Sequence, residues 1–174
     1  MKDNSVIERH IMSVLVDNEP GVLARVIGLF SGRGYNIESL TVAEVDIRKH
    51  LSRISIVTSG TPMVIEQIKS QLARLIPIHS VRDLTEMGAS IERELALVKI
   101  INKGDERIEA LRIADTFRAR TLDSTLESFV FEITGTSSKV AAFIDLMRSL
   151  GKVEISRTGV SAISRGNRID LSAK

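Results

Sequence analysis

The chain has 174 residues and no cysteine, so disulfides, thiolate zinc sites and a cysteine nucleophile are excluded together. Apolar residues make up 43% of it and aromatic residues only 3%, which predicts aliphatic cores in one domain or two small ones. The 24 basic and 22 acidic residues are interspersed and leave a formal net charge of +2, so no strongly basic surface for nucleic acid is expected.

The first half of the chain has the pattern of a strand, a helix and then two further strands. Apolar residues occur on both faces of residues 8–17, which predicts a central strand. From Gly21 the apolar spacing becomes helical, and glycines after the last apolar residue mark the end of this helix. A second helix begins at Pro62, a residue tolerated in a first turn, and a short strand closes the pattern. The order β-α-β-β-α-β over residues 8–85 predicts a ferredoxin-like domain.

The same order of elements is expected again in the second half, after a hinge at residues 86–90. Residues 95–101 have the pattern of a strand, and residues 105–119 and 136–150 have apolar stripes at helical spacing. Weaker strand patterns between and after these helices complete a second unit over residues 92–166. We therefore expect an α+β protein made of two ferredoxin-like βαββαβ domains.

Candidates for catalysis or metal binding are few. His10, His50 and His79 lie far apart in the sequence and have no partner at metal-ligand spacing. The adjacent carboxylates Asp105 and Glu106 fall at a predicted helix start, where negative charge stabilises the positive end of the helix dipole. We therefore predict no catalytic residue, no metal site and no cofactor in this chain.

Nucleotide and RNA binding also find little support. Residues 135–139 lack the first glycine and the Gly-Lys-Ser/Thr ending of a phosphate-binding loop, and a helix N-cap explains them. Ferredoxin-like sheets bind RNA through exposed aromatic side chains, but Phe30 falls on an apolar helix stripe and Tyr35 in a turn. Phe129 and Phe131 alternate along one strand pattern and are assigned to the core. No nucleic-acid partner is expected.

The segment between the first predicted strand and the first predicted helix is the strongest candidate for a binding site. Asn18 and Glu19 lie where the strand ends, and Gly21 lies where the helix begins. The first N–H groups of a helix have no partner within it and, with the helix dipole, they favour a carboxylate ligand. On spacing alone, an ordinary turn in which Asn18 caps the helix and Pro20 and Gly21 only shape the chain is the simpler alternative.

The residues around this turn resemble those of a known family. Residues 18–23, Asn-Glu-Pro-Gly-Val-Leu, and residues 34–40, Gly-Tyr-Asn-Ile-Glu-Ser-Leu, are similar to an ACT domain. More narrowly, they resemble the N-terminal domain of the small regulatory subunits of acetohydroxyacid synthase, also called acetolactate synthase. Residues 92–100 and 159–166 resemble parts of that family's C-terminal domain. The resemblance makes the first of the two expected domains an ACT domain that binds an amino acid and dimerises.

The resemblance implies a subunit without catalytic activity that activates a separate, large catalytic subunit and confers feedback inhibition by valine. The catalytic subunit of this family uses thiamine diphosphate, magnesium and FAD in branched-chain amino-acid biosynthesis. The ACT domains of the family pair in a homodimer, and valine or another branched-chain amino acid lies between them. The effector-binding residues implied in this way are Asn18, Glu19, Pro20, Gly21, Val22 and Leu23 of one protomer and Asn36 and Ile37 of the other.

Two alternatives stay open on the sequence. One is a free-standing ACT-domain sensor of amino acids, and the other is an amino-acid-responsive regulator that binds nucleic acid. The balanced charge and the absence of a helix-turn-helix pattern argue against the second. No apolar run approaches the roughly 18 residues that span a bilayer, and no signal peptide is recognised, so a cytoplasmic location and no membrane partner are expected.

Overall fold

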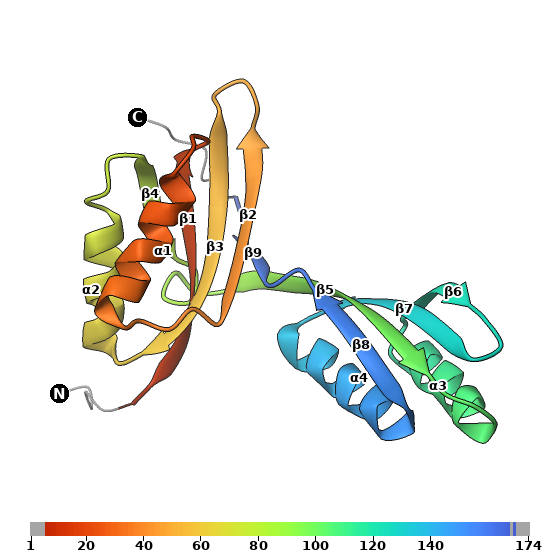
Figure 1. Cartoon of the computed structure of the whole chain (residues 1–174). Coiled ribbons are helices and arrows are strands. Elements are labelled where there is room, and N and C mark those ends of the chain that lie inside the picture. Colours follow the sequence, from red (N-terminus) through yellow and green to blue (C-terminus); the bar gives the residue numbers. More distant parts are fainter. Residues whose placement is uncertain (1–5, 168, 170–174) are drawn as a thin grey trace. The chain divides into compact units, whose positions relative to one another are not determined.

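The computed structural model describes residues 6–167 and 169. Contacts within the chain divide it into two compact units. The first unit contains the described residues up to Ile91 and those from Val160 onward, and the second contains Glu92–Gly159. Each unit is a sheet with helices packed against it (Figure 1). Among the described residues, no helix has the length and apolar character that crossing a bilayer requires.

The first unit has the β-α-β-β-α-β order that the sequence predicts. Its elements are β1 (Glu8–Asp17), α1 (Val22–Arg33), β2 (Ser39–Asp46), β3 (Leu51–Gly60), α2 (Pro62–Leu72) and β4 (Ile78–Asp83). The strands form an antiparallel sheet in the order β2-β3-β1-β4. The expected interior position of the first strand is therefore confirmed, and β2 is an edge strand.

The helices α1 and α2 bury an aliphatic core against one face of this sheet. Alternate residues of β1 point to this face, and Val14 pairs with Ile54 of β3 across the sheet. Helix α1 contributes residues at a spacing of four, and α2 contributes residues three and four apart, as the sequence pattern predicts. The buried helix residues are Val22, Val26 and Phe30 of α1 and Ile65, Ile68 and Leu72 of α2.

The opposite face of the same sheet is partly covered by a strand from near the end of the chain, β9 (Ser161–Ser164). Val160 and Ala162 are buried in a small cluster with Ile11, Val57 and Leu84. The N–H of Val160 also donates to the Ser39 hydroxyl at 2.7 Å. The segment from Val160 therefore groups with the first unit, because its apolar side chains pack against the first sheet. The second domain expected from the sequence extends further, to residue 166.

The second unit repeats the plan with its own antiparallel sheet. Its elements are β5 (Ser90–Ile101), which begins in the first unit, α3 (Asp105–Thr116), β6 (Arg120–Ser124), β7 (Ser128–Gly135), α4 (Ser137–Leu150) and β8 (Lys152–Arg157). The strand order is β6-β7-β5-β8, and β9 also pairs with β5. Helix α3 ends at Thr116, three residues before the expected end at residue 119, and Arg118 takes a positive φ of 56° in the turn that follows.

The core of the second unit contains the aromatic residues that the sequence assigns to it. Phe129 and Phe131 are 3% and 0% exposed, and their ring centroids lie 5.4 Å apart. Phe143 of α4 meets Phe131 edge to face, with centroids 6.1 Å apart. The burial of these two strand phenylalanines confirms that they are core residues and offer no stacking surface for bases.

A buried carboxylate joins two strands of the second unit. Glu94 of β5 is 4% exposed, and Arg157 at the end of β8 donates to both of its oxygens. The Nε–Oε1 and Nη2–Oε2 distances are 2.5 and 2.8 Å, which is a bidentate arrangement. The hydrogen bond to Glu94 raises the pKa of Arg157 further above its ordinary value. The two hydrogen bonds therefore satisfy a carboxyl group that the sheet has removed from water.

Substitution of Arg157 by Met should destabilise the chain, because the buried Glu94 then loses a charged double donor. We expect the free energy of unfolding to fall by about 2–3 kcal/mol in urea titrations. Arg148→Met is the matched control, since its 3.2 Å pair with Asp145 is exposed and worth less than about 0.5 kcal/mol. Equal losses in the two variants would contradict the special role of the buried pair.

Candidate functional site

The turn between β1 and α1 is shaped by its backbone. Gly21 is the N-cap of α1 and has φ 85° and ψ −9°, a left-handed conformation that glycine adopts at little cost. Its carbonyl accepts a hydrogen bond from the N–H of Arg25 at 3.1 Å, as at the start of a helix. Apart from its chain neighbours, no described residue has a heavy atom within 4 Å of the place where a Cβ would stand on Gly21. A ligand can therefore approach the backbone here.

The N-terminus of α1 lacks the usual partners of a helix start. No side chain caps it and no acidic residue lies in its first turn, so the alternative in which Asn18 caps the helix does not hold. In the second unit, Asp105 and Glu106 occupy the first turn of α3, as expected, and the Thr136 side chain caps α4. Helix α2 also lacks a capping side chain, but Pro62 removes one of its N–H donors. The start of α1 is thus the helix end best suited to an anion.

Two backbone hydrogen bonds fix the loop that precedes α1. The N–H of Asn18 donates to the carbonyl of His50 at 2.7 Å, and the N–H of Asp17 donates to the carbonyl of Pro77 at 2.9 Å. His50, in the turn just before β3, has a φ of 51°, an uncommon conformation for a residue with a side chain. The loop is therefore held from both neighbouring strands, while the Asn18 side chain stays exposed.

The predicted effector residues of this loop differ in what they can offer a ligand. The exposed ones are Asn18, Glu19, Pro20, Gly21 and Leu23. Val22 is only 4% exposed and packs in the core beneath α1, and its N–H donates to the carbonyl of Glu19 at 3.4 Å, so Val22 offers little to a ligand. The loop therefore presents mainly backbone donors, one amide side chain and one exposed leucine.

Asn36 and Ile37 follow the C-terminus of α1, whose C-cap residue Gly34 has a φ of 70°. The Thr58 hydroxyl donates to the carbonyl of Asn36 at 2.6 Å and ties this segment to the end of β3. Ile37 is half-buried against the core of the first unit, and Asn36 is exposed. The side chain of Asn36 is therefore available to a ligand, whereas Ile37 offers only part of its surface.

The two halves of the predicted site lie at opposite ends of one sheet. Asp17, which precedes Asn18, pairs with Leu51 at the start of β3, whereas Asn36 contacts Thr58 near its end. The strand from Leu51 to Thr58 spans roughly 23 Å at about 3.3 Å per residue, which is far longer than an amino acid. A single chain therefore does not bring the two halves together.

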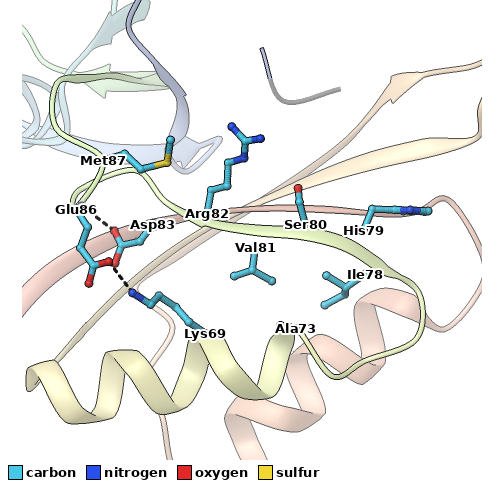
Figure 2. A pocket seen from close by; sticks show the side chains of 10 residues that line it. All are labelled: Lys69, Ala73, Ile78, His79, Ser80, Val81, Arg82, Asp83, Glu86 and Met87. Carbon is cyan, nitrogen blue, oxygen red and sulfur yellow. Dashed lines mark hydrogen bonds and ion pairs between the residues drawn. The ribbon is translucent and has the colours of Figure 1, made fainter. Parts of the chain in front are cut away.

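A separate groove of about 500 Å³ lies beside α2 and β4, and none of the eight predicted residues lines it (Figure 2). Lys69 crosses it, and its Nζ lies 2.6 Å from Glu86 Oε2 and 2.5 Å from Glu66 Oε1. Burial by itself lowers the pKa of Lys69, but the hydrogen bonds to these two carboxylates outweigh it and raise the pKa. Since these charges pair with each other, the groove attracts a charged ligand less than the open start of α1 does.

Two of the three histidines, His10 and His79, have acidic neighbours that the sequence spacing does not reveal, and His10 has several. His10 Nδ1 lies 2.7 Å from Asp83 Oδ2, and ligand atoms of His10, Asp83 and Glu86 all lie within 4.8 Å of one another. The sequence shows no partner at metal-ligand spacing for any histidine, whereas the fold brings two carboxylates to His10. His10 and Asp83 are 73 residues apart, and only the pairing of β1 with β4 brings them together.

The fold and the open helix start define an ACT domain. Residues 12–80 match the family model described as the AHAS small subunit-like ACT domain, which confirms the expected class of the first unit. Residues 93–166 match the family model described as the small subunit of acetolactate synthase. The two matches cover both units of the fold.

Individual relatives lead to the same family. The chain is 48% identical to a probable acetolactate synthase small subunit of Archaeoglobus fulgidus over 92% of this chain and 99% of that relative. It is 48% identical to the acetolactate synthase isozyme 3 small subunit of Escherichia coli over 92% and 98%. A solved acetolactate synthase small subunit of Thermotoga maritima superposes with a TM-score of 0.84, at 38% identity over 92% of this chain and 99% of that one. The chain belongs to the family of acetolactate synthase small subunits.

The conformation of Gly21 leads to a stability prediction. Gly21→Ala should lower the free energy of unfolding by about 1 kcal/mol, because a Cβ is strained at φ 85° although it meets no neighbour. Gly28→Ala is the matched control within α1, where the added Cβ also meets no neighbour and should stabilise by about 0.5–1 kcal/mol. Thermal unfolding at one protein concentration measures both effects, and a stabilising Gly21→Ala would contradict the left-handed turn.

Proposed function

We propose that this chain is the regulatory subunit of an acetolactate synthase, that it activates the catalytic subunit, and that it makes this enzyme sensitive to valine. The observation that carries the proposal is the uncapped, glycine-lined start of α1 in an ACT domain of this family. The synthase chemistry then belongs to the catalytic partner, where thiamine diphosphate, magnesium and FAD bind.

Pairing of two copies along the β2 edge provides a way to complete the effector site. Ser39 begins β2 shortly after Asn36, and Asp46 at its end pairs with Leu51, at the end of the sheet that carries Asn18. In an antiparallel pair of β2 strands, the start of one strand faces the end of the other. Asn36 of one protomer thus comes to the same end as the partner's loop, and the two-fold axis makes two such sites.

Exposed apolar side chains on β2 and α1 support the proposal that another chain covers this surface. Val42 and Val45 of the edge strand are 41% and 43% exposed, and Leu23 and Ile27 of α1 are 38% and 36% exposed. An unpaired edge strand with apolar side chains is a ready surface for another chain. A second ACT domain is the occupant that also completes the effector site.

The composite site has the groups that a branched-chain amino acid needs. The N–H groups at the start of α1 bind the α-carboxylate, and the amide oxygens of Asn18 and the partner's Asn36 accept from the ammonium group. The partner's Ile37, with Leu23, covers the aliphatic side chain, and full burial of a valine side chain contributes about 1.5–3 kcal/mol. Backbone donors thus provide affinity for any amino acid, and the apolar contacts select the side chain.

Valine regulates the enzyme in this proposal through the geometry of the dimer. A ligand held by both protomers binds better when the two halves of the site are close, and it stabilises that arrangement by its differential affinity. The catalytic subunit then responds to the arrangement of the regulatory pair. No residue of this chain has to take part in the chemistry.

Reconstitution tests the proposed function directly. We expect no acetolactate formation from this chain alone, a higher rate when it is mixed with a matching catalytic subunit, and inhibition of the mixture by valine. An acetolactate assay with and without valine measures all three. An unchanged rate on mixing would contradict the proposal.

The position of the ligand carboxylate is tested by Gly21→Asp. Aspartate tolerates a positive φ better than most residues, but its carboxylate occupies the place of the ligand's carboxylate. We expect valine affinity to fall at least about 100-fold while activation is retained. Gly21→Asn has nearly the same size without the charge and should stay within about tenfold of wild type. Equal losses in the two variants would contradict carboxylate binding at the start of α1.

A further inference from the structure

A cluster of one histidine and several carboxylates lies at the end of the first unit's core where β1 begins. His10 and Asp83 are 4% and 5% exposed, and the exposed Glu86 follows Asp83 in the next turn. Figure 2 shows Asp83 and Glu86 side by side, with Lys69 reaching toward them from α2. Glu8, on the same strand as His10, has its Oε2 3.7 Å from His10 Nε2. The ligand atoms of His10, Asp83 and Glu86 therefore lie close together, and Glu8 adds a carboxylate beside His10 Nε2.

His10 has one satisfied and one unsatisfied nitrogen. Nδ1 is hydrogen bonded to Asp83 Oδ2 at 2.7 Å, and an ionised carboxylate there fixes the proton on Nδ1. Nε2 is then the nitrogen with the lone pair, and it is buried with no hydrogen-bond partner among the described residues. A carboxylate that holds one imidazole nitrogen while the other remains open is the arrangement of histidines that bind metals.

Asp83 is itself held in place for this role. Its Oδ1 accepts hydrogen bonds from the N–H of Thr85 at 2.9 Å and from the N–H of Glu86 at 3.3 Å. The same turn that fixes Asp83 also carries the Glu86 carboxylate to the cluster. The imidazole is thus oriented before a ligand arrives, and the exposed side chains of Glu8 and Glu86 can rotate toward an ion.

We propose that His10, Glu8 and Glu86 bind a divalent transition-metal ion of the Zn²⁺ type, with Asp83 as the residue that positions the imidazole. His10 binds through Nε2, and the two glutamates supply carboxylate oxygens, a ligand set that zinc accepts in tetrahedral sites with water in the fourth position. The bound ion joins the start of β1 to the turn after β4. It also supplies the missing partner of the buried nitrogen.

Lys69 competes with the ion for one ligand. Its ammonium group lies 2.6 Å from Glu86 Oε2 and neutralises this carboxylate when no ion is present. Binding of a divalent cation requires the ammonium to move away, because the two positive charges repel each other. Replacement of Lys69 by an uncharged residue should therefore tighten metal binding.

Calorimetric titration of the untagged full chain with Zn²⁺ alone tests the site. We expect one ion per chain and a rise in the melting temperature of the chain, because a ligand that binds only the folded state stabilises it. His10→Ala should abolish binding, and Glu86→Gln, an exposed change that leaves the core intact, should weaken it at least about tenfold. Lys69→Met should bind more tightly than the wild type.

His79→Ala is the matched control, because it removes the other histidine that pairs with an aspartate, 2.6 Å from Asp17. Its Zn²⁺ affinity should equal that of the wild type. Absence of binding by the wild-type chain would overturn the proposal, and so would wild-type affinity in both His10→Ala and Glu86→Gln. A loss in His79→Ala as large as in His10→Ala would also overturn it, because it would indicate binding to surface histidines in general.

Discussion

The length of the β1–β3 ladder is the constraint on which the proposed regulation depends. The loop after Asp17 and the segment around Asn36 lie at opposite ends of this ladder, separated by roughly 23 Å of strand. A chain with this fold cannot close both halves around one small molecule. The edge position of β2 then becomes important, because in the proposed dimer antiparallel pairing along it brings each half to the complementary half of another copy. In a composite site of this kind, ligand binding depends on how the two chains pair.

The two ends of the same sheet carry different chemistry. At one end, backbone hydrogen bonds to the carbonyls of His50 and Pro77 fix the loop before α1. The uncapped start of this helix is suited to an anion. At the other end, His10 lies opposite Thr58 in the β1–β3 ladder, and the Thr58 hydroxyl donates a hydrogen bond to the carbonyl of Asn36. The acidic cluster that we propose for a cation therefore lies at the same end of the sheet as Asn36, in the second half of the proposed effector site. The second unit, whose α3 start is filled by acidic residues, offers no equivalent anion site at that helix.

Much of this fold could be predicted from local patterns. The strand before Asn18, the helix stripe of Val22, Val26 and Phe30, and the ferredoxin-like order all follow from periodicity and glycine placement. The return of Val160 to the first sheet could not be predicted, because a short strand carries little periodic signal and its partners are far away in the chain. The pairing of His10 with Asp83 could not be predicted either, because the two residues are 73 positions apart in the chain. Asn18 has the residue type of a helix cap, but the left-handed Gly21 begins the helix three residues later.

Complementation between two defective chains tests the composite site most directly. Gly21→Asp damages the loop half, and Asn36→Lys places a positive charge against the ligand's ammonium group in the other half. Each variant alone should fail to bind valine in a calorimetric titration. A heterodimer of the two contains one site with both substitutions and one site with neither, so the account predicts that valine binding returns on mixing, at about one site per heterodimer. No recovery in a mixture whose heterodimer is verified would contradict it.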